Sequence, residues 1–247
     1  AITNCLNFGN PQDPEVYWQF KEAVRGVGDM CRVLNTPVTG GNVSFYNETL
    51  QSAVYPTPTI GMVGLIKDVD NTTTMNLKHE NDLVVILGSL NSQLGGSSYL
   101  RTIENKINGP LFHFNPDEEK QVQDTCLEAI KTNLITSAHD ISDGGLAVSL
   151  SEMVVSSEGT LGTDIYIESE LSDLELLFGE CASTIIVTVK EKDLFKLVLL
   201  TKKYDINSQT IGSVNNNNRL KINDILDVDK EDISKAYYNT LNKIMTT

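Results

Sequence analysis

Residues 137–155 decide the fold: they read Ser-Ala-His-Asp-Ile-Ser-Asp-Gly-Gly-Leu-Ala-Val-Ser-Leu-Ser-Glu-Met-Val-Val. The beginning of this stretch predicts a short strand that enters His139. Two glycines interrupt it, and the apolar run from Gly145 to about Val155 is typical of a buried helix. A strand that leads directly into a buried helix indicates a protein of packed α and β layers.

Outward from this stretch, helices and strands alternate without the regular βαβ order of a parallel sheet. The preceding segments predict a buried strand at 83–88 and a helix from about Glu118 to Lys131. The following segments predict strands near 163–168 and 183–189, a helix near 191–203, a strand at 208–214, a hairpin turn at 215–218 and a C-terminal helix from about Lys230. The irregular order favours an α+β fold with a mixed sheet and covering helices over a Rossmann sheet.

The N-terminal part predicts one long helix followed by extended segments. Asp13 can cap a helix that begins at Pro14 and runs to Leu34, with apolar residues every three or four positions forming one buried stripe. A strand follows from about Pro37, and a further strand is expected at 59–66, where two glycines imply bulges or a close backbone approach. The polar stretch 67–81 then predicts a boundary between one domain at 1–75 and another at 76–247.

Composition excludes several classes of protein. The 247 residues are 40% hydrophobic and 21% charged, which predicts a globular protein. The longest aliphatic run, Leu83 to Leu87, is far too short to cross a membrane. A net charge of −14 argues against nucleic acid as a partner. The four cysteines lack metal-site or disulfide spacing, so we expect reduced thiols in a cytoplasmic protein. A start at Ala1 without Met predicts a piece of a longer protein.

The first candidate site is Gly40-Gly41-Asn42-Val43-Ser44, at the end of a predicted strand. Glycines let backbone N–H groups approach phosphate oxygens, while an Asn carbonyl oxygen can bind a hard cation and a Ser hydroxyl can donate to an anion. This pattern is compatible with a nucleotide or phosphate site. On the residues alone, an ordinary Gly-Gly turn with Asn in a left-handed conformation is the favoured explanation, because short Gly motifs often occur without a ligand.

The second candidate lies in the opening stretch, where Asp140 and Asp143 precede a helix start. Free N–H groups at such a start can hold an anion, or a cation and phosphate together through the carboxylates. Alternatively, Ser142 or Asp143 simply caps the helix and His139 packs behind it.

Three further motifs give weaker signals. The segment Asn4 to Asn10 offers carboxamides that can bind a base edge but are equally common in turns. Gly95-Gly96-Ser97 predicts a turn or a helix start, and Leu177 to Cys181 predicts a structural loop whose cysteine has no histidine partner. The histidines at 79, 113 and 139 share no metal-ligand spacing, which argues against zinc.

Five segments together resemble one family in order along almost the whole chain. They are NCLNFGNPQDPEVYWQF, TPVTGGNVSFYNET, YPTPTIGMVGLI, SAHDISDGGLAVSLSEM and LFGECAS, and they are similar to the C-terminal part of the synthetase subunit of the phosphoribosylformylglycinamidine synthase family. Family members carry two pairs of A and B domains like those of aminoimidazole ribonucleotide (AIR) synthetase. The resemblance implies that the chain is the later part of the second A domain followed by the whole second B domain.

The resemblance implies an ATP-dependent C–N ligase of de novo purine biosynthesis. In the family reaction, the amide oxygen of formylglycinamide ribonucleotide is phosphorylated, and ammonia derived from glutamine displaces phosphate to give the amidine. Carried over by motif, Gly41 would contact ATP, Asn42 would bind Mg²⁺ and Ser44 would hold the substrate. Asn4 stands where the family is expected to have an Asp that binds ATP, so the charge of that ligand is missing here.

The resemblance also bears on Asp140 and on what the chain lacks. Asp140 corresponds to a segment that supplies a Mg²⁺ ligand in the first B domain, so it would serve a live or vestigial nucleotide site, or only the fold. The catalytic histidines and the ATP-binding Lys belong to the first A domain, so we expect no catalytic residue in this chain and no activity of the chain alone. Implied partners are the rest of the synthetase chain, a glutaminase subunit or domain and the ribonucleotide substrate.

Two alternatives remain open. The chain could be a non-catalytic scaffold, with or without an auxiliary nucleotide site, or part of a related AIR-synthetase superfamily enzyme with another substrate.

Overall fold

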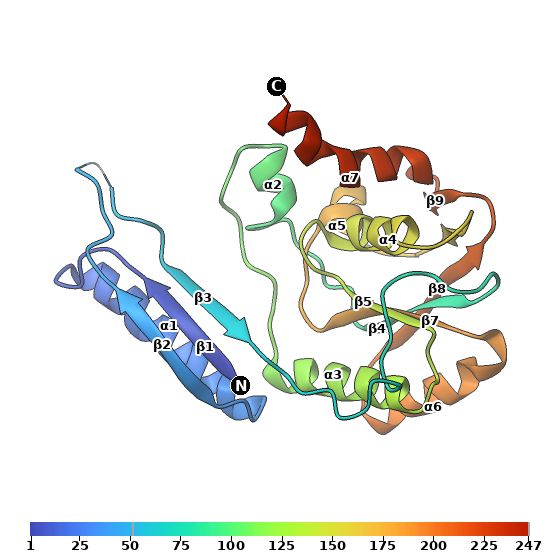
Figure 1. Cartoon of the computed structure of the whole chain (residues 1–247), viewed down its shortest axis with the longest axis horizontal. Helices are drawn as coiled ribbons and strands as arrows, with labels where there is room; N and C mark the ends of the chain where they lie inside the picture. The colour runs from blue at the N-terminus through green and yellow to red at the C-terminus, as the bar shows by residue number, and fades with distance from the viewer. Residues whose placement is uncertain (51, 247) are drawn as a thin grey trace. The chain divides into compact units, whose positions relative to one another are not determined.

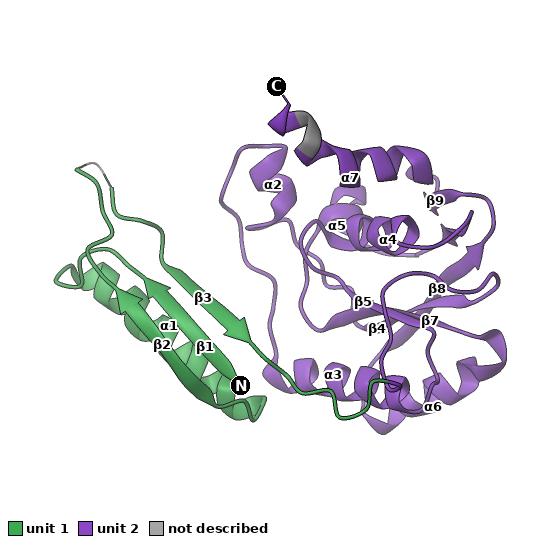
Figure 2. Cartoon of the chain, viewed as in Figure 1, with its two compact units in different colours: residues 1–69 green, residues 70–247 purple. Residues whose placement is uncertain are grey.

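The computed structural model describes residues 1–50 and 52–246, and the chain forms two compact units, residues 1–69 and 70–247 (Figure 2). The division lies six residues before the expected boundary at 75. Residues 73 and 74 already belong to the larger unit, because the Thr73 hydroxyl donates to the Thr136 carbonyl oxygen (2.9 Å) and the Thr74 carbonyl oxygen accepts from the Ala138 N–H (3.2 Å). Contacts of this kind link segments far apart in sequence, which composition cannot locate.

The described residues of the smaller unit form one sheet with one long helix. Its elements are β1 (Ile2–Asn7), α1 (Pro14–Val33), β2 (Val38–Ser44) and β3 (Thr57–Met62). β1 is the central strand, with β2 parallel on one side and β3 antiparallel on the other. Helix α1 connects the two parallel strands and lies along one face of the sheet (Figure 1). This is the crossover geometry that parallel strands require.

Helix α1 begins as its sequence predicts. The Asp13 carboxylate accepts from the Glu15 N–H at 2.9 Å, and Pro14 occupies the first turn. The expected buried stripe is only partly buried, because no residue of α1 is fully buried. The helix packs on a narrow sheet, where Phe20 makes edge-to-face contacts with Phe8 and Phe45 at 5.5 and 5.0 Å between ring centroids.

Strand β3 lies earlier than the expected 59–66. It pairs with β1 from Asn7 opposite Thr57 to Ile2 opposite Met62. Pairing continues only to Ala1, which exchanges backbone hydrogen bonds with Val63 at 3.0 and 2.9 Å. The strand therefore ends where its partner strand begins, and no bulge interrupts its pairing with β1 at Gly61.

The larger unit is built on a mixed sheet in the order β10-β9-β6-β8-β4-β7-β5. Its strands are β4 (Leu83–Gly88), β5 (Ser137–Asp140), β6 (Gly162–Ile165), β7 (Thr184–Val189), β8 (Ser208–Asn215), β9 (Arg219–Ile222) and β10 (Leu226–Asp229). Its helices are α2 (Ser98–Thr102), α3 (Pro116–Lys131), α4 (Gly145–Val155), α5 (Asp173–Phe178), α6 (Leu194–Lys203) and α7 (Lys230–Met245), with a 3₁₀ turn, η1 (Glu191–Asp193), before α6. The fold class is α+β, as expected.

Two hydrophobic cores lie on the two faces of this sheet. Along β4, Val84 and Ile86 point into one core with α4 and α5, while Val85 and Leu87 point into the other with α3 and α6. Figure 1 shows α4, α5 and α7 on one side of the sheet and α3 and α6 on the other. A central strand buried on both faces explains why residues 83–87 are continuously apolar.

Three features of the larger unit differ from expectation. Asn215–Asn218 is not a hairpin turn, because β6 lies between β8 and β9 and pairs antiparallel with one and parallel with the other. Helix α3 begins two residues earlier than expected, at Pro116, and the Asn115 carboxamide oxygen accepts from the Asp117 N–H at 3.0 Å. Helix α5 was not predicted, although Ser172 and Glu175 form a capping box.

No helix in the described residues combines the length and the apolar character that a membrane crossing needs.

Candidate functional site

The first candidate site lies where β1 and β2 run side by side in the smaller unit. Their parallel register places Asn4 beside Gly41, Cys5 beside Asn42 and Asn7 beside Ser44. The segment Asn4 to Asn10 and the Gly-Gly-Asn-Val-Ser motif, about 35 residues apart in sequence, therefore form neighbouring strands. Pairing of β1 with β2 places all four residues of this unit that sequence analysis singled out on two neighbouring strands.

Gly41 has no room for a side chain. A Cβ atom at this position would lie 2.6 Å from the Asn4 backbone oxygen and would also overlap the Asn4 carboxamide oxygen. At Gly40, by contrast, a Cβ atom would meet nothing within 4 Å. The Asn4 side chain thus lies directly against the backbone of Gly41, and of the two glycines only Gly41 is required by its neighbours.

The four predicted residues lie on two faces of the sheet. Because side chains alternate along a strand, Asn42 and Ser44 share one face. Asn4 lies on the other: it pairs with Ile60, and Ile60 lines a cavity of about 310 Å³ with Ile2, Val27 and Met30 between the sheet and α1. The structure therefore brings together Asn42 with Ser44, and Asn4 with Gly41, as two pairs.

The face that carries Asn42 and Ser44 is open within its unit. Residues Val38 to Val43 of β2 are exposed, as is every residue of β3. Among the described residues of this unit, α1 is the one helix, and it covers the opposite face. The carboxamide of Asn42 is thus available to a ligand in this unit.

Ser44 is held by a residue that sequence analysis missed. The hydroxyl of Ser44 lies 3.2 Å from both side-chain polar atoms of Asn47. The Asn47 amide nitrogen also donates to the carbonyl oxygens of Ser44 (2.9 Å) and Phe8 (3.2 Å), which joins the ends of β1 and β2. Asn47 belongs to the same motif segment, and its carboxamide three residues after Ser44 is a recognisable turn signal.

The second candidate site lies at the end of β5 in the larger unit. The Asp140 side chain is 70% exposed and has its Oδ1 atom 3.2 Å from Nδ1 of His139. The ring of His139 is only 12% exposed and has its Nε2 atom 2.8 Å from the Glu152 carboxylate on α4. Sequence analysis missed Glu152, which lies within the helix expected from Gly145 to about Val155.

The N–H groups at the start of α4 do not have the hydrogen-bond acceptor that the sequence suggested. Neither Ser142 nor Asp143 caps α4: the N-cap is Gly144, with φ of 84° and no side-chain cap. Instead, Glu180 accepts hydrogen bonds from the N–H groups of Gly144 (2.9 Å) and Ser98 (2.8 Å). A carboxylate of the chain itself thus occupies a position that an anionic ligand could take.

This contact unites three motifs that looked separate in the sequence. Ser97 caps α2, as a helix start in the Gly-Gly-Ser loop predicted. Leu177 and Phe178 end α5, which corrects the expectation of a loop, and Glu180 follows them. A Cβ atom at Gly145 would lie 2.5 Å from the Gly179 oxygen, so these loops pack closely.

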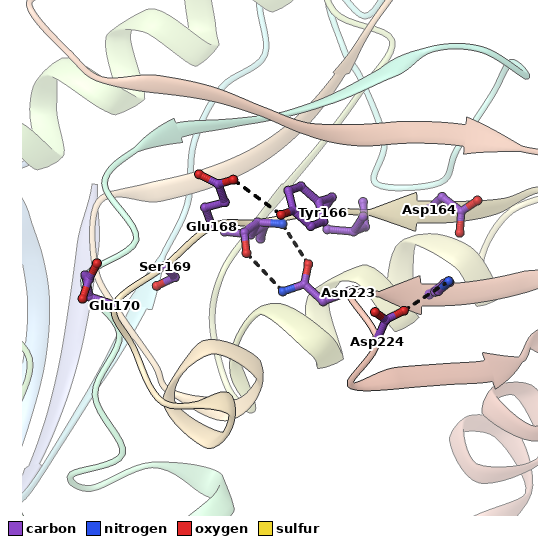
Figure 3. Close-up of a pocket in the computed structure, with 10 residues that line it drawn as sticks. Asp164, Tyr166, Glu168, Ser169, Glu170, Asn223 and Asp224 are labelled. Carbon is purple, nitrogen blue, oxygen red and sulfur yellow. Dashed lines mark hydrogen bonds and ion pairs between the residues drawn. The ribbon is translucent and has the colours of Figure 1, made fainter.

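A cleft of about 570 Å³ lies beside β6 and the β9–β10 turn and is lined by none of the predicted site residues (Figure 3). Its carboxylates come from Asp164, Glu168, Glu170 and Asp224. Asn223 bridges backbone atoms there, since it accepts from the Ile167 N–H (2.9 Å) and donates to the Ile167 oxygen (3.1 Å). The polar groups of Asn223 serve the loop, and the acidic lining disfavours a phosphate ligand.

The donor types at the two candidate sites fit a hard cation. Asn42 offers a carboxamide oxygen and Asp140 a carboxylate, the oxygen ligands that Mg²⁺ prefers. No group of three or more His, Cys, Asp or Glu residues that could hold a metal occurs in residues 1–50 and 52–246. Any cation at either position would therefore need further oxygen ligands from phosphate, water or other protein residues.

The two buried thiols of the larger unit are poor nucleophiles. All four cysteines are free. Burial raises the pKa of the Cys126 thiol to about 11 and also raises the pKa of the Cys181 thiol. Both groups are therefore protonated near neutral pH, in agreement with the expectation for Cys181.

Two family models match the chain in sequence order. The AIR synthase related protein, N-terminal domain, matches residues 1–66, and the AIR synthase related protein, C-terminal domain, matches residues 79–225. The chain is 39% identical over 253 residues to the phosphoribosylformylglycinamidine synthase subunit PurL of Anaeromyxobacter dehalogenans, a match that covers 99% of this chain. The chain spans only 29% to 33% of the length of the curated relatives it matches.

Solved structures share the fold at low sequence identity. Thermotoga maritima PurL complexed with FGAR superposes with a TM-score of 0.71 and 16% identity, over 94% of this chain and 39% of that chain. The same protein complexed with ATP gives a TM-score of 0.66 at 16% identity, over 94% and 37% of the two chains.

Proposed function

The chain belongs to the AIR synthase related protein family, and from this premise we propose that it is the C-terminal part of an ATP-dependent phosphoribosylformylglycinamidine synthase. The observation that carries the proposal is the 39% identity to a PurL subunit over nearly the whole chain. The proposed reaction makes formylglycinamidine ribonucleotide from formylglycinamide ribonucleotide and ammonia from glutamine.

ATP and Mg²⁺ are the proposed cofactors. The solved complex of T. maritima PurL with ATP supports the first, and the oxygen donors of Asn42 and Asp140 are of the type that fits the second. When bound, ATP with its cation would supply the phosphoryl group that activates the substrate amide.

The residues of the smaller unit have separate proposed roles. Gly41 lets its backbone approach the nucleotide because it carries no Cβ. Asn42 offers its carboxamide oxygen to the cation, and the Ser44 hydroxyl, oriented by Asn47, donates to the ribonucleotide substrate. Asn4 lies against Gly41 on the other face of the sheet, so we propose that it shapes that backbone and that any contact of Asn4 with ATP is uncharged.

The rest of the site would come from outside this chain. We assign no catalytic residue here and expect the chain alone to be inactive, with the remainder of the synthetase as one partner and a glutaminase subunit or domain as another. A cytoplasmic location agrees with this role.

The proposal is tested by building a chimera. This chain replaces the matching segment of A. dehalogenans PurL, and the chimera is expressed in a bacterium that lacks its own PurL. Growth without added purine is expected for the chimera and for its Asn108→Ala variant, which removes an exposed carboxamide outside the candidate sites. The Asn42→Ala variant should fail to grow while its protein accumulates normally.

A folded, abundant chimera that never supports growth would contradict the proposal. A chimera that grows equally well with Asn42→Ala would instead favour the scaffold alternative, in which this unit serves assembly and not cation binding. The isolated chain, assayed with ATP, ammonia and substrate, should form no amidine.

A further inference from the structure

The open face of the sheet in the smaller unit consists of three rows of residues that cross β2, β1 and β3. Residues that are paired across neighbouring strands project to the same face of a sheet. From β2 through β1 to β3, the register gives the rows Ser44, Asn7 and Thr57; Asn42, Cys5 and Thr59; and Gly40, Thr3 and Gly61. The proposed substrate ligand Ser44 and the proposed cation ligand Asn42 therefore lie in neighbouring rows.

This face is polar and uncharged. Its rows contain three threonines, one serine, two asparagines, one cysteine and two glycines, and none of these side chains is charged or aliphatic. The opposite face is apolar, since Ile2, Ile60 and Met62 line the cavity beside α1. A face that packs against a helix or a second sheet carries apolar side chains. Hydroxyl and carboxamide groups instead suit hydrogen bonds with an uncharged polar ligand.

Two carboxamides lie near the Ser44 hydroxyl, and they differ in how firmly the protein holds them. The Asn47 nitrogen donates to the carbonyl oxygens of Ser44 and Phe8 at 2.9 and 3.2 Å, so this side chain serves the backbone. The Asn7 nitrogen makes weaker contacts, at 3.4 Å to the Cys5 carbonyl oxygen and at 3.5 Å to the Cys5 sulfur, which is a poor acceptor. A ligand can therefore compete for the Asn7 carboxamide more easily than for that of Asn47.

We propose that Asn7 is a further substrate-binding residue, whose carboxamide forms hydrogen bonds, next to Ser44, with an uncharged amide or hydroxyl group of the ribonucleotide. This role rests on the proposed function and on Ser44 as a substrate ligand. Because the three rows contain no lysine, arginine or histidine, they offer no partner for the substrate phosphate. The face thus contacts the ribose and glycinamide parts, and a carboxamide suits both because it donates and accepts.

The test measures substrate affinity in the chimera described above, with formylglycinamide ribonucleotide as the probe. Asn7→Ala should raise the KM for this substrate about fivefold or more, as expected for the loss of one or two neutral hydrogen bonds, with the KM for ATP and kcat changed by less than about twofold. Asn7→Asp keeps the shape of the side chain but removes its N–H donor, so it should also raise the substrate KM.

Thr3→Val is the matched control on the same face. Thr3 lies about 13 Å from Asn7 along β1, at about 3.3 Å per residue, and belongs to the row farthest from Ser44. Valine has nearly the shape of threonine, so the variant removes a hydroxyl from the face without changing its contour. The KM for formylglycinamide ribonucleotide should therefore stay within about twofold of that of the parent chimera.

The Cys5 thiol provides a readout that does not depend on turnover. Cys5 shares the open face with Asn7, whereas Cys31 lines the cavity beside α1, and both cysteines are partly buried. Bound substrate should therefore slow the alkylation of Cys5 by iodoacetamide but not that of Cys31, and mass spectrometry of the two peptides measures both rates. In Asn7→Ala, half-maximal protection of Cys5 should require about fivefold more substrate.

The outcomes separate the role of Asn7 from the proposed function. If the chimera turns over but Asn7→Ala changes neither the substrate KM nor the protection of Cys5, the role of Asn7 is wrong and the proposed function stands. A folded chimera that shows neither turnover nor protection of Cys5 overturns both. If Asn7→Ala does not fold, Asn7→Asp decides, and a folded Asn7→Asp chimera with the substrate KM of its parent refutes the role of Asn7.

Discussion

Replacing Gly41 with alanine should destabilise the smaller unit by an amount that its neighbours determine. The added Cβ would lie 2.6 Å from the Asn4 backbone oxygen, well inside ordinary contact distance, and would also overlap the Asn4 carboxamide. The carboxamide can rotate away, but the backbone oxygen belongs to the central strand β1 and cannot move alone. Overpacking of this kind typically costs about 1 to 3 kcal/mol.

The molecule contains its own probe for this measurement. Trp18, on α1, is the single tryptophan of the chain, so its fluorescence reports unfolding of the smaller unit in urea. With a slope of about 1 kcal/mol per molar urea for so small a unit, Gly41→Ala should lower the midpoint by about 1 M or more. Gly40→Ala is the matched control, because a Cβ there meets nothing within 4 Å.

A second variant identifies the atoms responsible. Adding Asn4→Ala to Gly41→Ala removes the overlap with the carboxamide but leaves the overlap with the backbone oxygen, so the double variant should recover only part of the loss. If Gly41→Ala and Gly40→Ala unfold at the same urea concentration, the close packing of Asn4 against Gly41 is refuted.

Three further expectations concern the larger unit. Glu180→Ala should cost about 1 kcal/mol, since two partly buried N–H groups lose their acceptor, and hydrogen exchange at Gly144 should speed up while Glu180→Gln shows a smaller effect. Hydrogen bonds from Lys203 and Tyr204 lower the pKa of Glu128. The stability that the Glu128 carboxylate provides is therefore complete above its ordinary pKa of 4.5 and is lost as the pH falls through the lower pKa of the folded protein. The stability of Glu128→Gln, measured as the pH is lowered, should not show this loss. A thiol reagent at pH 8 should modify Cys126 only after denaturation, because its pKa is about 11, and rapid reaction of the native protein at this residue would show that it is not buried.

Local signals in the sequence predicted the elements that depend on local physics. Asp13 and Pro14 fix the start of α1, and the continuous apolar run 83–87 predicted the central strand β4. Helix α5 could also have been predicted from the sequence, because Ser172 and Glu175 form a capping box. What local pattern could not supply was the insertion of β6 between β8 and β9, which depends on pairing between distant segments.

Local sequence patterns likewise predict one part of the candidate site, whereas the other part depends on contacts between distant segments. That Asn42 and Ser44 share a face follows from their spacing of two along one strand. That Asn4 lies against Gly41 on the other face depends on the parallel register of β1 and β2, which their separate sequences do not encode. The role of Glu180 at the start of α4 joins residues 36 apart and needed the tertiary structure.

The four cysteines are free, as their spacing predicted. The α+β class followed from the irregular order of helices and strands, and the family models that match residues 1–66 and 79–225 agree with it.

The most direct test of the central claim is the affinity of Mg-ATP for the folded chimera, measured by calorimetry with Asn42 intact and with Asn42→Ala. If the carboxamide binds the cation of the nucleotide, its removal should weaken binding by about 1 to 3 kcal/mol, roughly five- to 150-fold, while Asn108→Ala changes nothing. An Asn42→Ala chimera that binds Mg-ATP as tightly as its parent would contradict the account.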